Sequence, residues 1–280
     1  GRGGGALDRA GGPAGPARAG PGARVDSSAV PTEPPAHEQL AALLLAAERP
    51  VALTGLALGA IAPTEEGAGG DEWSRRASLE HLLTEPADFW AFYHPQAEAI
   101  AARTPGPGHE ALARLERAGV LAALVTQAVD HLHAKAGTLD PVEVHGNVLS
   151  ARCTRCGERY ALPEVGALIR SSPDGVPRCT TEGCAFPLRP AGTLWGEPLV
   201  PEAATRAWAL AGETDLFLVL DSQLRTVPVS LLPSVPLTRG VPLALVGTTP
   251  TQYDRYAKQV VRTPSPDLLV ALADLIAPAG

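Results

Sequence analysis

The sequence predicts an α/β fold in which helices cover both faces of a parallel sheet, joined to one small zinc module. Two observations lead to this fold class. Short apolar runs bounded by turn residues alternate with amphipathic helical segments, as in parallel sheets buried on both sides. A stretch near the middle of the chain breaks that rhythm and contains all four cysteines. The regular part is therefore expected to be a Rossmann-like domain, and the cysteine-bearing stretch a structural-zinc module.

The expected strands are continuous apolar runs, and the expected helices have apolar residues three or four positions apart. The strands are Pro50–Thr54, Leu121–Thr126, Asp215–Leu220 and Pro242–Val246. The helices are Glu38–Glu48, His109–Arg117, Gln127–Ala136 and Pro266–Ile276. Each strand is followed by a turn and then by further helical sequence, which predicts parallel pairing.

Composition divides the chain into four regions. Residues 1–36 contain 9 Gly, 6 Pro and 8 Ala and too little apolar surface to offset the entropy of ordering, so they are expected to form a disordered tail. Residues 37–146 are expected to form the first part of the Rossmann-like domain, with a helical insertion over about 62–105. Residues 147–189 form the predicted zinc module, and 190–280 the second part of the Rossmann-like domain.

Charge and hydropathy limit the function classes. The formal net charge is −7, which argues against direct nucleic-acid binding, because that requires a basic face. No apolar run reaches the roughly 18 residues of a membrane-spanning helix, and no secretory signal is recognisable. We therefore expect a cytoplasmic protein without a membrane partner. The preference for arginine over lysine, with abundant Ala, Gly and Pro, is typical of a GC-rich bacterial genome.

The four cysteines form two pairs. Cys153 and Cys156 are separated by two residues, and Cys179 and Cys184 by four. Two such thiolate pairs can supply four tetrahedral ligands to one Zn²⁺ ion. A site closed by four protein ligands has no open position for a substrate, so the predicted Zn²⁺ is structural.

Several motifs together resemble the sirtuin family. The run from Leu124 to His133 (LVTQAVDHLH) is similar to the family's T-Q-N-(I/V)-D-G-L-H, and Val144-His145-Gly146 precedes the first cysteine pair as it does in sirtuins. After the second pair, Leu188-Arg189-Pro190 and Trp195-Gly196-Glu197-Pro198-Leu199 resemble L-R-P and F-G-E-x-L. The resemblance extends over about residues 40–276.

The resemblance implies an NAD-dependent protein-lysine deacylase. In sirtuins the acyl oxygen attacks the anomeric carbon of the nicotinamide ribose, nicotinamide leaves, and a histidine acts as general base on a ribose hydroxyl. The residues that match are His145 for the base and Gly55, Gln127 and Asp130 for NAD. Those that match the site of an acylated-lysine protein or peptide are Trp195, Gly196 and Glu197.

Departures from the family pattern fall on the predicted NAD site. The glycine-rich loop has Ala57 in place of its second glycine, and Pro63-Thr64-Glu65-Glu66 stands where the family has P-x-F-R. Ala128 replaces the asparagine of Q-N-x-D, and Asp221 replaces the glycine of G-T-S. Gly247 stands where the family's asparagine contacts the adenosine ribose.

Two functional hypotheses of different class follow. The first is a divergent deacylase that uses NAD through altered loops. The second is a non-catalytic sirtuin homologue that binds a protein or another ligand in the same cleft. Because several cofactor contacts are replaced at once, the sequence alone favours the second hypothesis modestly. Fold by itself does not decide between them.

Overall fold

The computed structural model of the 280-residue chain describes residues 34–56, 58 and 70–278. The predicted tail over 1–36 and the departures at Ala57 and at 63–66 therefore lie largely outside the described residues. The first described helix, α1, spans Ala36–Ala46. The predicted division into four regions stays a prediction.

Six parallel strands form the main sheet, in the order β3-β2-β1-β7-β8-β9. Their bounds are β1 Pro50–Thr54, β2 Ala123–Thr126, β3 Val142–Glu143, β7 Leu216–Leu220, β8 Leu243–Val246 and β9 Gln259–Val261. The predicted α/β class with a Rossmann-like parallel sheet is confirmed. The first strand, β1, lies inside the sheet. β2 and β3 are added on one side of β1, and β7, β8 and β9 follow on its other side. This reversal of direction places a crevice between the carboxyl ends of β1 and β7, where ligands bind in open α/β sheets.

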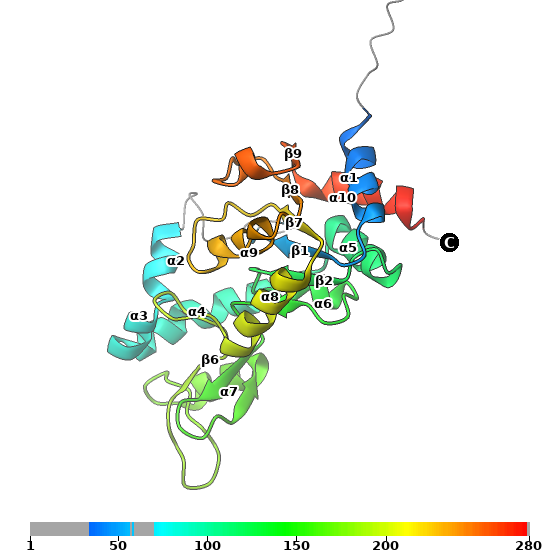
Figure 1. Cartoon of the computed structure of the whole chain (residues 1–280). Helices are drawn as coiled ribbons and strands as arrows, with labels where there is room; N and C mark the ends of the chain where they lie inside the picture. The colour runs from blue at the N-terminus through cyan, green and yellow to red at the C-terminus, as the bar shows by residue number, and fades with distance from the viewer. Residues whose placement is uncertain (1–33, 57, 59–69, 279–280) are drawn as a thin grey trace, which may run out of the picture. The chain divides into compact units, whose positions relative to one another are not determined.

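Helices cover the two faces of this sheet because alternate residues of each buried strand point to opposite sides. On one face, Ala52 and Leu218 pack in a cluster with α1, α5 (Pro107–Arg117) and α10 (Ser265–Ile276). Figure 1 shows α1, α5 and α10 grouped on the same side of the sheet. On the other face, Val51 and Phe217 pack against α8 (Pro201–Glu213), and residues of α9 (Ser234–Thr238) join that cluster.

A third apolar cluster joins the helices after β1 to the cysteine-bearing segment. The helices are α2 (Gly70–Arg76), α3 (Leu79–Thr84) and α4 (Pro86–Ala101), and α4 buries Phe89, Trp90 and Tyr93. The cysteine-bearing segment forms a three-stranded sheet in the order β5-β4-β6, with α7 (Leu162–Ser171) beside it. Its strands are β4 Ser150–Cys153, β5 Arg159–Ala161 and β6 Leu188–Pro190.

The predicted helix over Gln127–Ala136 is wrong in its first half. Residues 127–131 form a loop, and the helix α6 is confined to Leu132–Lys135. His131 has a left-handed backbone with φ of 62°, and the Asp130 carboxylate accepts a hydrogen bond from the Leu132 amide at 3.0 Å. This bond from a side chain to the backbone two residues on forms a local turn, which competes with helical hydrogen bonding and delays the start of the helix.

Two short 3₁₀ helices, Val229–Leu231 and Asp254–Tyr256, complete the described elements. Among the described residues, no helix is both long and apolar enough to cross a bilayer. The predicted cytoplasmic location stays a prediction.

Adjacent leucines of α1 test how the sheet is covered. Leu44 is 1% exposed in the cluster beneath α1 and α10, whereas Leu45 is 65% exposed. We expect Leu44→Ala to lower the free energy of unfolding by about 2–5 kcal/mol, because it removes buried methyl groups and leaves a cavity. Leu45→Ala should change it by less than about 0.5 kcal/mol. Urea unfolding measures both, and equal effects would contradict this packing.

Candidate functional site

Two cavities lie at the carboxyl end of the main sheet and share two residues. The first, of about 330 Å³, lies beyond β1, β7 and β8 and is bordered by the residues that begin α10. The second, of about 320 Å³, lies between the sheet and the residues that follow β3 and β6. Leu56 and Gln127 line both cavities. A ligand longer than one cavity can therefore extend from the first into the second at this point.

Gly55 ends β1 at the first cavity, and the structure explains why it is glycine. Its amide donates to the Leu220 carbonyl at 2.8 Å, which ties the end of β1 to the end of β7. A Cβ at Gly55 would lie 1.9 Å from the Asp221 carbonyl oxygen. Any side chain here would push the two strand ends apart, so Gly55 maintains the shape of the crevice.

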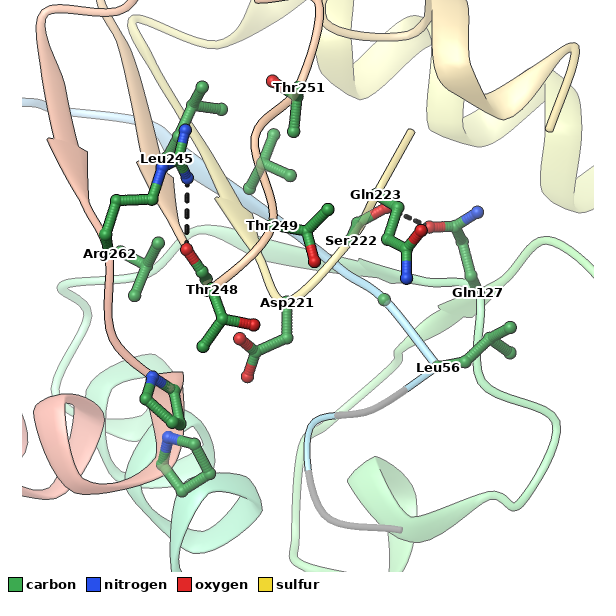
Figure 2. A pocket seen from close by; sticks show the side chains of 16 residues that line it. Leu56, Gln127, Asp221, Ser222, Gln223, Leu245, Thr248, Thr249, Thr251 and Arg262 are labelled. Carbon is green, nitrogen blue, oxygen red and sulfur yellow. Dashed lines mark hydrogen bonds between the residues drawn. The ribbon is translucent and has the colours of Figure 1, made fainter. Parts of the chain in front are cut away.

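Asp221 follows β7 and lies in the first cavity with its side chain fixed. Its backbone is left-handed, with φ of 48°. Oδ2 accepts hydrogen bonds from the Ser265 amide at 3.1 Å and from the Ser265 hydroxyl at 2.5 Å. Burial raises the pKa of Asp221, while these two hydrogen bonds oppose the rise. Figure 2 shows the Asp221 and Thr248 side chains on one side of the cavity and Gln127 on the other.

A buried hydroxyl network holds the chain on either side of Gln127. Thr54 donates to the Thr126 hydroxyl at 2.7 Å, and the Thr126 oxygen accepts from the Ala128 amide at 3.0 Å. The Thr54 oxygen also lies 3.0 Å from Nε2 of His133. Burial lowers the pKa of His133 to about 3, so this ring stays neutral within the network.

The Gln127 side chain is oriented from the opposite strand end. Its Oε1 accepts a hydrogen bond from the Ser222 hydroxyl at 2.6 Å, drawn as a dashed line in Figure 2. The Gln127 backbone amide also donates to the Thr54 carbonyl at 3.0 Å, so β1 fixes its backbone and the end of β7 fixes its side chain. The predicted cofactor residues Gly55 and Gln127 lie together at the first cavity.

His145 lines the second cavity from the loop after β3. The backbone around it is fixed on both sides, because Val144 donates to Thr126 at 3.1 Å and Thr193 donates to the His145 carbonyl at 2.8 Å. Burial lowers the pKa of His145 below its usual value of 6.5. The imidazole is therefore uncharged near neutral pH and able to accept a proton.

A carboxylate supports the loop that carries His145. Glu143 Oε2 accepts a hydrogen bond from the side-chain Nδ2 of Asn147 at 2.7 Å, and its Oε1 lies 2.7 Å from His131 Nδ1. These contacts connect the residues before and after His145. The contact with Glu143 also gives the side chain of the left-handed His131 a partner.

The rest of the second cavity is largely apolar. Its walls include Trp73, Tyr93, Val129, Val148 and Leu194, and none of the described residues that line it is lysine or arginine. Predicted substrate residues Trp195, Gly196 and Glu197 line it as well. Trp195 is 39% exposed at the surface. The chemistry of the walls suits an uncharged, apolar group.

Glu197 and Asp130 are both engaged in contacts within the chain. Glu197 forms an ion pair with Arg189 and accepts from the Leu194 amide at 2.8 Å, so it shapes the turn that precedes it. Asp130 is 6% exposed and accepts from the Leu132 amide, and it is not among the described residues that line either cavity. The predicted ligand roles of both residues stay predictions.

Sequence reasoning missed three contributors to the cavities. Ser265 anchors Asp221 from α10, and Arg262 lines the first cavity while donating to the Gly247 carbonyl at 3.1 Å. Gln223 has a buried Oε1 without a hydrogen-bond partner among the described residues. Gln223 could have been found from the sequence, because it follows the carboxyl end of a predicted strand. Ser265 could not, because its contact with Asp221 is long-range and leaves no local pattern in the sequence.

The four predicted zinc ligands come together. The sulfur atoms of Cys153, Cys156, Cys179 and Cys184 all lie within 4.8 Å of one another. The Sγ atoms of Cys153 and Cys184 are 3.6 Å apart, and so are those of Cys156 and Cys179. A tetrahedron of sulfurs about 2.3 Å from Zn²⁺ has edges of about 3.8 Å, so the arrangement fits a structural zinc ion. Hydrogen bonds from the Thr181 side chain and the Tyr160 hydroxyl lower the pKa of Cys179 to about 6, which favours the thiolate that binds metal.

Metal analysis tests the cysteine site. We expect about one zinc per chain, and we expect Cys179→Ser to remove it and to expose the β4–β6 module to protease, because closed thiolate sites contribute directly to folding. Thr180→Ser, next to the ligand, is the matched control and should retain the metal. Full zinc content in Cys179→Ser would contradict the assignment.

Glycine substitutions test the contact between the strand ends. Gly55→Ala should lower the free energy of unfolding by at least about 1–3 kcal/mol, because its methyl group overlaps the Asp221 backbone. Gly212→Ala is the control, since a Cβ there meets nothing within 4 Å, and it should be neutral or slightly stabilising. Thermal unfolding of the two variants compares them, and an unaffected Gly55→Ala protein would contradict the described contact.

Known proteins of one family are similar to this chain over most of its length. A model of the Sir2 family matches residues 71–228. NAD-dependent protein deacetylase 1 of Pyrobaculum aerophilum is 31% identical over 243 residues, covering 85% of this chain and 93% of the relative. An NAD-dependent protein deacylase of Thermococcus kodakarensis is 34% identical over 249 residues, covering 85% and 96%. A solved structure of a Sir2 protein bound to a propionylated peptide matches with a TM-score of 0.77 at 26% identity, covering 86% of this chain and 99% of that one. The chain therefore belongs to the Sir2 family, the sirtuins.

Proposed function

We propose that this protein is an NAD-dependent protein-lysine deacylase, which transfers the acyl group of a modified lysine to ADP-ribose and releases nicotinamide. The observation that carries the proposal is the junction at Gln127. This residue lines both cavities, and His145 lines the second. A dinucleotide in the first cavity can thus present its far end to the cavity that contains a neutral histidine.

The residues of the first cavity fit a dinucleotide. Gly55 lets the ends of β1 and β7 approach each other closely, and Thr248 and Thr249 add hydroxyl groups to the cavity lining. Parallel strand ends at a reversal of strand order are the usual site of such ligands. NAD, when bound, supplies the ribose carbon that receives the acyl oxygen. Relatives with NAD in their names and a Sir2 structure containing a p53 peptide and NAD⁺ support the same cofactor.

His145 is the proposed general base. Its ring stays uncharged near neutral pH because burial lowers its pKa, so a ring nitrogen can accept a proton from a ribose hydroxyl. The Thr193 amide and the hydrogen bonds of Glu143 fix the loop that carries it. His145 then holds the proton while the acyl group moves, and the apolar walls around it exclude water.

An acylated lysine of a protein or peptide is the proposed substrate. Trp73, Tyr93 and Leu194 provide apolar walls for an uncharged acyl group. The Sir2 structures that match this chain include complexes with propionylated and acetylated peptides. We place the peptide along Trp195 and Gly196, where the positive φ of Gly196, 88°, turns the chain at the edge of the cavity.

A second candidate function is favoured by one observation. The Asp221 carboxylate lies in the cavity proposed for the cofactor, where an anion opposes phosphate groups. Glu65 and Glu66, which also bear on this hypothesis, lie outside the described residues. On this second account the protein is a non-catalytic sirtuin homologue that binds acylated peptides or another ligand without turnover.

Nicotinamide release from NAD tests the proposal. With zinc-loaded protein and an acetyl-lysine peptide, we expect peptide-dependent release that His145→Ala reduces about 100-fold or more, because a general base contributes that much. The acid limb of kcat/KM should lie below pH 6.5, since the lowered pKa keeps His145 unprotonated until the pH falls through that value.

His37→Ala is the matched control, because His37 lies on α1 and lines neither cavity. It should retain full activity. Absence of nicotinamide release, together with peptide binding by fluorescence anisotropy, would replace the proposal with the second candidate. Release that His145→Ala leaves unchanged would contradict the role of this histidine.

A further inference from the structure

The Asp221 carboxylate is held in one position rather than free to move. Both of its hydrogen bonds run through Oδ2, to the amide and hydroxyl of Ser265. Ser265 begins α10, a helix of 12 residues, so the positive end of the helix dipole faces the carboxylate. The left-handed backbone at Asp221 directs the side chain toward this helix rather than along the β7 axis.

The other oxygen, Oδ1, occupies the space beside Gly247 at the end of β8. A Cβ at Gly247 would lie 3.2 Å from Oδ1 and 3.3 Å from the Asp221 Cα. Gly247 also has φ of 150°, which disfavours other residues. A side chain from the end of β8 and the Asp221 side chain therefore compete for one space. In this chain the Asp221 carboxylate, which follows β7, fills that space, and Gly247 after β8 contributes no side chain to it.

The chemistry of Oδ1 defines what can bind next to it. An ionised carboxylate accepts hydrogen bonds and donates none. In other dinucleotide-binding folds, an acidic side chain beside the crevice binds the ribose 2′-hydroxyl of NAD, and an arginine there instead accommodates a 2′-phosphate. Asp221 offers the same acceptor from a different strand, β7, and its charge would repel a phosphate at that point. Arg262, the cation that lines the same cavity, is already paired with Asp254 and donates to Gly247. Its charge is therefore already balanced in part by Asp254.

We propose that Asp221 is a specificity-determining residue of the first cavity. Its Oδ1 accepts a hydrogen bond from a hydroxyl of the adenosine ribose and excludes a dinucleotide that carries a phosphate at the ribose 2′ position. The inference rests on the proposed function, because it requires that an NAD-type dinucleotide binds in this cavity. On this account the acid is a selective contact that replaces one from β8.

Calorimetric titration of the zinc-loaded full chain with NAD and with NADP tests the inference. We expect NAD to bind at least about tenfold more tightly than NADP, because a like charge beside the 2′-phosphate opposes binding. Asp221→Asn, which keeps the shape and removes the charge, should reduce this ratio by about tenfold and weaken NAD itself only a few-fold. Asp267→Asn makes the same charge change in the first turn of α10 without lining the cavity, and it should leave the ratio unaltered.

Ser265→Ala is the second variant, and it keeps the acid while removing one of its two anchors. It should reduce the NAD preference by a smaller factor than Asp221→Asn, which keeps the test decisive if Asp221→Asn does not fold. Equal binding of NAD and NADP to the unaltered protein, or an affinity ratio that neither variant changes, would overturn the inference. The proposed function would still stand if nicotinamide release were observed. Failure of both dinucleotides to bind would overturn the proposed function and this inference together.

Discussion

The contact between Gly55 and the Asp221 backbone is the constraint on which the rest of the site depends. β1 and β7 are neighbours in the sheet, and their ends approach so closely that no Cβ fits at Gly55. At this contact Asp221 leaves β7 with a left-handed backbone, and its carboxylate accepts hydrogen bonds from Ser265 of α10. Asp221 thus contacts three elements at once: Gly55 after β1, Gly247 after β8 and Ser265 at the start of α10.

Two cavities with different walls meet beside that contact. The first combines hydroxyl and amide groups with one carboxylate, and the second is largely apolar around a histidine. Both His133 and His145 have pKa values lowered by burial, but their surroundings differ. His133 lies inside a hydroxyl network between strand ends, whereas His145 lines an open cavity. Burial keeps both rings neutral. Only His145 can reach a ligand in a cavity, which is why it is the proposed base and His133 is structural.

Much of the fold was predictable because it depends on local sequence patterns. The apolar runs at 50–54 and 242–246 coincide with β1 and β8 to within one residue, since buried parallel strands are continuously apolar. The cysteine spacing likewise predicted a cluster that the structure forms. The helix expected from Gln127 failed because the hydrogen bond from the Leu132 amide to Asp130 and the His131–Glu143 contact outweigh helical propensity. The anchoring of Asp221 by Ser265, 44 residues away, could not be predicted, because it depends on the packed positions of β7 and α10.

The central claim is that one dinucleotide spans both cavities through Gln127. A crystal structure of the zinc-loaded protein with NAD and an acetyl-lysine peptide measures this most directly. The account predicts the adenosine ribose within hydrogen-bonding distance of Asp221, the nicotinamide end beside Gln127, and the acyl group in the second cavity facing His145. NAD bound outside the first cavity, or a peptide whose acyl-lysine lies away from His145, would contradict it.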